Sequence, residues 1–127
     1  MTRGRVCGML VIALLGVAQL GAVQQDTMSA TEGVALVRQV NTIMGQLMLR
    51  NNAYMTLEDV VMHPTFTRAE GVELTNADSG TYKRYRLTVV GVVGLQSYQL
   101  SLVPANGCGP SWFSNETHLI FTGTCVP

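Results

Sequence analysis

Tyr85-Arg-Leu-Thr-Val89 and Tyr98-Gln-Leu-Ser-Leu102 are the two stretches that decide the fold, because apolar and polar residues alternate along both of them. A period of two gives a strand one buried face and one wet face, as in an antiparallel sheet that packs on a helix. We therefore predict strands over residues 81–93 and 95–103. Gly91 and Gly94 bracket the short connection between these strands, so we expect the pair to form a hairpin.

A long amphipathic helix is predicted before the hairpin, over residues 27–50. Ser29 and Glu32 have the spacing of a capping box, in which each side chain bonds to a backbone N–H of the other residue. Asn51-Asn52 supplies a stop, because Asn tolerates the left-handed conformation at a helix end. The apolar stripe that would face the sheet recurs at steps of three and four residues. Its members are Leu36, Val37, Val40, Ile43, Met44 and Leu47.

The shorter elements complete an α+β domain. A single helical turn is predicted from Thr56, ended where His63 precedes Pro64. Short strands are predicted over residues 71–75 and 118–122, and turn chemistry fills residues 76–80. We therefore expect one long N-terminal helix packed on a three- to four-stranded antiparallel sheet, with a loop closed by a disulfide at the C-terminus.

The N-terminus has the pattern of an export signal. Arg3 and Arg5 give a basic start, and residues 7–23 are apolar except for Gln19. Small residues place candidate cleavage sites after Ala18 and Ala22. We expect residues 1–22 to be a cleaved signal peptide; a retained membrane leader and a buried core helix are the alternatives. Residues 23–127 then form one small exported domain, which is periplasmic, extracellular or anchored to a membrane.

Cysteine usage agrees with export. Loss of the leader removes Cys7 and leaves the pair Cys108 and Cys125, which in an oxidising compartment is predicted to form a disulfide. Two separate buried thiols are the alternative. No Cys-x-x-Cys or histidine pair supplies a set of zinc ligands, so we expect no metal and no cofactor.

The charges favour neither a nucleic-acid binder nor an enzyme. Without Arg3 and Arg5 the domain is mildly acidic, whereas nucleic-acid binding needs a basic face. The one basic cluster, residues 83–86, is interpreted as part of a solvated strand. His63, His118 and Lys83 could supply the acid, base and cation of a secreted hydrolase, but no spacing brings them together. We therefore expect no catalytic residues.

Trp112 and Phe113 are the predicted partner-binding residues. They lie within the Cys108–Cys125 loop, where aromatic side chains are typical of contact hot spots. The alternative is that both rings fold inward over the edge of the sheet.

Three stretches together resemble the type IV pilins and the type II secretion pseudopilins. They are the apolar run from Met9 to Val17, the passage Leu49-Arg-Asn-Asn-Ala-Tyr-Met-Thr-Leu-Glu58 and the loop bounded by Cys108 and Cys125. The resemblance implies a non-enzymatic, extracytoplasmic structural or interaction subunit that binds other protein subunits, with residues 7–23 as a membrane attachment.

The chain departs from the family at its N-terminus. Arg5 follows Gly4 where pilin precursors have a Gly-Phe cleavage site, and Met9 stands where they have a glutamate. Prepilin processing and the usual pairing in assembly are therefore not carried over. A secreted or periplasmic binding module or inhibitor is the main alternative function, and a small secreted hydrolase is the third.

Overall fold

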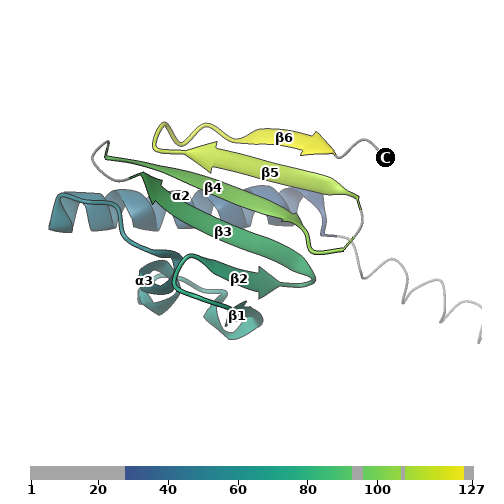
Figure 1. Cartoon of the computed structure of the whole chain (residues 1–127), viewed down its shortest axis with the longest axis horizontal. Helices are drawn as coiled ribbons and strands as arrows, with labels where there is room; N and C mark the ends of the chain where they lie inside the picture. Colours follow the sequence, from purple (N-terminus) through teal and green to yellow (C-terminus); the bar gives the residue numbers. More distant parts are fainter. Residues whose placement is uncertain (1–27, 93–95, 107, 125–127) are drawn as a thin grey trace, which may run out of the picture.

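The structure is a computed structural model that describes residues 28–92, 96–106 and 108–124. It shows an α+β fold in which one long helix, α2 (Ala30–Asn51), lies across a face of an antiparallel sheet (Figure 1). The six strands follow the order β1-β2-β3-β4-β5-β6, so every strand pairs with its neighbour in sequence. The strands are β1 (Val72–Leu74), β2 (Ser79–Tyr82), β3 (Tyr85–Val92), β4 (Ser97–Pro104), β5 (Pro110–Asn115) and β6 (Phe121–Thr124). The predicted leader, residues 1–22, lies outside the described residues.

Helix α2 begins and ends close to where the sequence predicts. The Ser29 side chain accepts a hydrogen bond from the Glu32 backbone N–H, and Asn52 ends the helix in the left-handed conformation. The other half of the predicted capping box, in which the Glu32 side chain accepts from the Ser29 backbone N–H, is wrong. Glu32 Oε1 instead accepts hydrogen bonds from Lys83 Nζ at 2.6 Å and from the Tyr82 hydroxyl at 3.0 Å. An ion pair to the sheet therefore replaces the local contact.

The connector after α2 contains one more short helix, α3 (Leu57–Met62). Thr56 and Asp59 form a capping box at its start, and His63 ends it in an extended conformation before Pro64. This agrees with the helical turn predicted from Thr56. A 3₁₀ turn, η1 (Ala69–Gly71), then leads into β1.

The single strand predicted over residues 81–93 is wrong, because the chain turns at Lys83 and Arg84. Both residues have positive φ, 47° and 65°, and Tyr82 pairs with Tyr85 across the resulting two-residue hairpin turn. Lys83 and Arg84 therefore belong to a turn, where they do not alternate between the faces of a strand. The predicted pairing of the next two strands is confirmed, since β3 and β4 pair along their whole length.

The sheet is wider than the predicted three or four strands. Residues 110–115, expected to be a loop, form β5 between β4 and β6. The last strand begins at Phe121, three residues after the predicted start, because His118 has a positive φ of 64° in the preceding turn.

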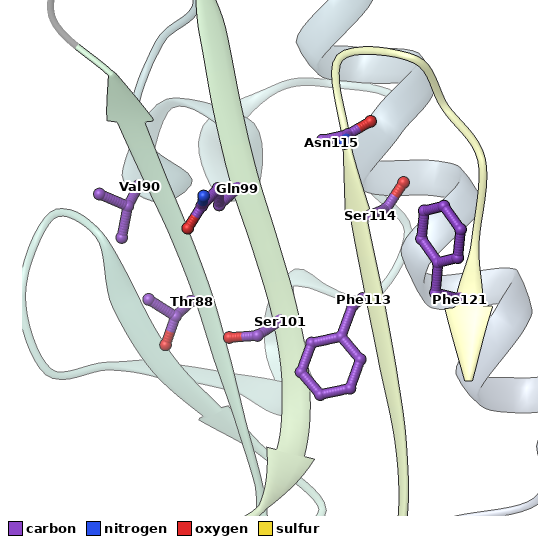
Figure 2. Close-up of a pocket in the computed structure, with 8 residues that line it drawn as sticks. All are labelled: Thr88, Val90, Gln99, Ser101, Phe113, Ser114, Asn115 and Phe121. Atoms are coloured by element: carbon purple, nitrogen blue, oxygen red, sulfur yellow. The ribbon is translucent and has the colours of Figure 1, made fainter. Parts of the chain in front are cut away.

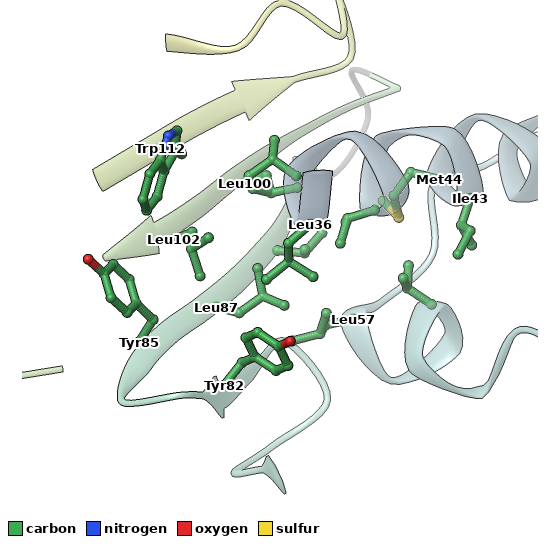
Figure 3. Packing of buried hydrophobic residues seen from close by; sticks show 14 of the residues in the cluster. Leu36, Ile43, Met44, Leu57, Tyr82, Tyr85, Leu87, Leu100, Leu102 and Trp112 are labelled. Atoms are coloured by element: carbon green, nitrogen blue, oxygen red, sulfur yellow. The ribbon is translucent and has the colours of Figure 1, made fainter. Parts of the chain in front are cut away.

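The core lies between α2 and the sheet, where large apolar side chains from both layers meet (Figure 3). The predicted stripe of α2 is buried there, except that Leu47 is only partly covered. Trp112 of β5 packs so closely on α2 that a Cβ built on Gly33 would lie 2.5 Å from ring atoms Cε2 and Cζ2. Only a glycine leaves room for the helix at this distance from the indole.

A buried polar network crosses the same interface. The Tyr98 hydroxyl donates to Asn41 Oδ1 at 2.6 Å, and Asn41 Nδ2 donates to Ser114 Oγ at 2.8 Å. Ser114 in turn donates to the Leu119 carbonyl at 2.7 Å. Burial raises the pKa of Tyr98, so its hydroxyl keeps the proton that it donates. The network fixes α2 against β4 and against the turn between β5 and β6.

Candidate functional site

The face of the sheet opposite α2 carries a hollow that is the candidate site. Alternation along the strands sends Tyr98, Leu100 and Leu102 of β4 into the core and leaves Gln99 and Ser101 on the other face. The same alternation exposes Val90 on β3 and Phe113 on β5. We call this surface the outer face.

The strand registers align these side chains into rows. One row runs across four strands through Thr88, Ser101, Phe113 and Phe121, since each residue is the direct partner of the next. Residues directly opposite in an antiparallel pair have Cβ atoms about 5 Å apart. The outer face therefore presents two phenylalanine side chains on adjacent strands, next to the hydroxyl groups of Thr88 and Ser101.

A shallow hollow of about 390 Å³ lies over these rows, and Figure 2 shows the side chains around it. Its lining consists of Thr88, Val90, Gln99, Ser101, Phe113, Ser114, Asn115 and Phe121. Phe113 is 41% exposed and Phe121 is 55% exposed. None of the eight lining side chains is ionisable, and the nearest charged residue along β3 on this face is Arg86, two positions before Thr88.

Several polar groups of the hollow have no partner among the residues that the structure describes. Neither the Gln99 amide nor the Ser101 hydroxyl makes a side-chain hydrogen bond to them. Asn115 uses its Oδ1 to accept from the Thr117 backbone N–H at 2.9 Å and hydroxyl at 2.6 Å, which leaves its Nδ2 donor unused there. The hollow can therefore offer donors and acceptors to a bound molecule.

The two predicted partner-binding residues lie on opposite sides of the sheet, since they are consecutive on β5. Phe113 lies on the outer face, where a partner can reach it. Trp112 is 2% exposed and its ring lies tilted against Tyr85, with 5.8 Å between the ring centroids, so its predicted role as an accessible contact is wrong. The inward alternative holds for Trp112 alone, because neighbouring residues of a strand point to opposite faces.

Of the two cysteines in the predicted disulfide, only Cys108 is described, because Cys125 lies outside the described residues. Cys108 precedes β5 by two residues, and Thr124, the residue before Cys125, pairs with Pro110. The disulfide stays a prediction.

The side chains considered for catalysis are spread along the molecule. Lys83 is bound to Glu32 near the start of α2, whereas the His118 ring lies against Gly45 of the same helix. At 1.5 Å per residue, these two positions on the helix are about 20 Å apart. His63 Nδ1 instead contacts the Thr65 hydroxyl at 2.8 Å. The arrangement does not assemble an acid, a base and a cation around one substrate.

Sequence reasoning missed Gln99, Ser101 and Phe121 as members of a site. Their signal was present as the polar half of the alternating run 98–102 and as an apolar residue in the last predicted strand. It could not be interpreted without the strand pairing, because the site draws on four strands.

No group of three or more metal-ligating side chains occurs in residues 28–92, 96–106 and 108–124, and no helix in these ranges is long and apolar enough to cross a membrane. Comparison with protein-family models, with curated proteins and with solved structures gave no match to this chain.

Proposed function

We propose that this chain is an extracytoplasmic, non-enzymatic subunit of the type IV pilin or pseudopilin kind, with a structural role and other protein subunits as its partners. The observation that carries the proposal is the placement of α2. The helix buries one apolar side on the sheet and begins at Ala30, shortly after the apolar run of residues 7–23. This arrangement suits a subunit held at its N-terminal end by a membrane or by an assembly.

The other side of α2 supports the same proposal. Arg38, Thr42, Gln46 and Leu49 recur at helical spacing and are all exposed. Leu49 is 90% exposed, and no described segment of the chain covers this stripe. A helix with one side on its own sheet and a mixed polar and apolar side left open can pack against a second subunit.

The alternative function is a free, exported binding module or inhibitor. The hollow on the outer face favours it, because a concave surface with exposed rings and unused polar groups is typical of a binding site. The two functions differ in what the exported protein contacts and in where its leader ends.

Site-specific photocrosslinking in the native cell tests the proposal. A photoreactive amino acid replaces Thr42 on the open side of α2, and a second version carries it at Ala77, an exposed turn residue that serves as the matched control. The intact mass of the exported protein is measured in parallel to locate any cleavage. We expect Thr42, and not Ala77, to crosslink to another copy or to another membrane-associated subunit.

A different result would contradict the proposal. A monomer cut after Ala18 or Ala22, free of the membrane and without crosslinks from Thr42, would remove the subunit proposal and leave the binding module.

A further inference from the structure

The hollow on the outer face has the chemistry of a site for an uncharged, hydroxyl-rich molecule. Among the residues that the structure describes, its lining holds no carboxylate, ammonium, guanidinium or imidazole group. A charged ligand would find no counter-charge there to offset the loss of its hydration. The ligand that fits this lining is therefore neutral.

The two exposed rings add a flat apolar surface. Phe113 and Phe121 are direct partners on β5 and β6, so their rings come from adjacent strands on one face of the sheet. Each exposes about half of its surface to water, although burial of a phenylalanine side chain is favourable. A ligand with an apolar face of its own would cover them.

The polar groups lie beside the rings, on β4 and β5. The Gln99 amide can donate and accept, the Ser101 hydroxyl can do both, and the Asn115 Nδ2 can donate. Three interstrand spacings separate β3 from β6, which is roughly 15 Å. The hollow thus offers rings at one end and neutral hydrogen-bonding groups over the length of a short chain of sugars.

We propose that the outer face binds a neutral oligosaccharide in this hollow. The rings of Phe113 and Phe121 stack on the C–H face of a pyranose, and Gln99, Ser101 and Asn115 bond to its hydroxyl groups. The site lies on the face opposite α2, so it does not depend on whether the helix joins an assembly.

Titration of the full-length exported protein with neutral hexasaccharides tests this site. The probes are hexasaccharides of β-1,4-glucose, α-1,4-glucose, β-1,4-N-acetylglucosamine, β-1,4-mannose and β-1,4-galactose, each up to about 10 mM, and calorimetry measures the binding. Any detergent used is free of sugar head groups. The variants are Phe113→Ala, Phe121→Ala and Gln99→Ala, and the matched control is Met62→Ala, an exposed apolar residue of α3 outside the lining of the hollow.

At least one hexasaccharide is expected to bind, and each phenylalanine variant is expected to weaken it about tenfold, with a smaller loss for Gln99→Ala. Met62→Ala should bind like the parent. Thermal unfolding midpoints near that of the parent show that the variants are folded, and Phe113→Leu and Phe121→Leu replace any that are not. No binding by any probe would overturn the proposal, as would binding that survives the phenylalanine variants. Self-association through the outer face, lost in those variants in place of sugar binding, would also overturn it and identify a second copy as the occupant.

Discussion

Gly33 and Gly45 lie on the same helix, yet replacement by alanine should change the stability of the protein in opposite directions. Alanine favours a helix interior by about 1 kcal/mol over glycine, and this gain applies to both positions. At Gly45 the new Cβ would lie 3.3 Å from His118 Cε1, an exposed ring that can move aside. We therefore expect Gly45→Ala to raise the free energy of unfolding by up to about 1 kcal/mol.

At Gly33 the surroundings make the replacement by alanine destabilising. A Cβ there would lie 2.5, 2.5 and 2.6 Å from three atoms of the Trp112 ring, about 1 Å inside normal contact. The indole is buried and packs on Tyr85, so it cannot move freely. Overpacking of a core costs about 1–3 kcal/mol, and three simultaneous overlaps indicate the upper end of that range. After the helix gain is subtracted, Gly33→Ala should lower the free energy of unfolding by about 2 kcal/mol.

Urea unfolding of the parent and both variants, followed by circular dichroism, measures these changes. A third comparison isolates the contact: in a Trp112→Leu background, Gly33→Ala should lose its penalty, which gives a coupling energy in a double-mutant cycle. If Gly33→Ala stabilised the protein as much as Gly45→Ala, the close packing of α2 on β5 would be refuted.

Three further changes test other parts of the structure. Tyr98→Phe should cost about 1–3 kcal/mol of unfolding free energy, because it leaves the buried Asn41 Oδ1 without its donor; an unchanged urea midpoint would contradict the network. The hydrogen bond from Lys83 lowers the pKa of Glu32 in the folded state. The stabilisation by the ionised Glu32 carboxylate is therefore fully present above the unfolded-state pKa of about 4.5, and it is lost as the pH falls through the lower, folded-state pKa. Glu32→Gln should therefore lower the urea midpoint at neutral pH and lose that effect in acid, whereas an equal difference at every pH would contradict the ion pair. Cys108→Ser should cost about 3 kcal/mol and match the effect of a reductant on the parent, and a reductant without effect would exclude the predicted disulfide.

The parts of the fold that the sequence predicts are those with a local cause. Ser29 caps α2, Asn52 ends it, and the alternating runs form β3 and β4, since each signal acts over a few neighbouring residues. The turn at Lys83 and Arg84 has no such signal. Positive φ is costly for these residues and is normally left to glycine or asparagine, so the turn is held by tertiary contacts such as the Lys83–Glu32 ion pair.

Strand β5 and the outer-face hollow could not be predicted from the sequence, because both depend on contacts between distant segments. Pro110-Ser-Trp-Phe-Ser-Asn115 has the composition of a loop, and it becomes a strand because β4 and β6 lie on either side of it. Membership of the hollow depends on the register among four strands. The sequence could not divide Trp112 and Phe113 between the two faces, because that division follows only once β5 is known to be a strand.

The sequential order of the strands has a consequence for how the protein is made. Each hairpin can close as soon as its two strands have been synthesised, yet the bond from Asn41 to Ser114 spans 73 positions of the chain. A polypeptide that is synthesised from its N-terminus leaves the apolar side of α2 incompletely covered until β5 has been made. Any chaperone that binds the nascent chain would therefore have to cover that surface until β5 pairs with β4.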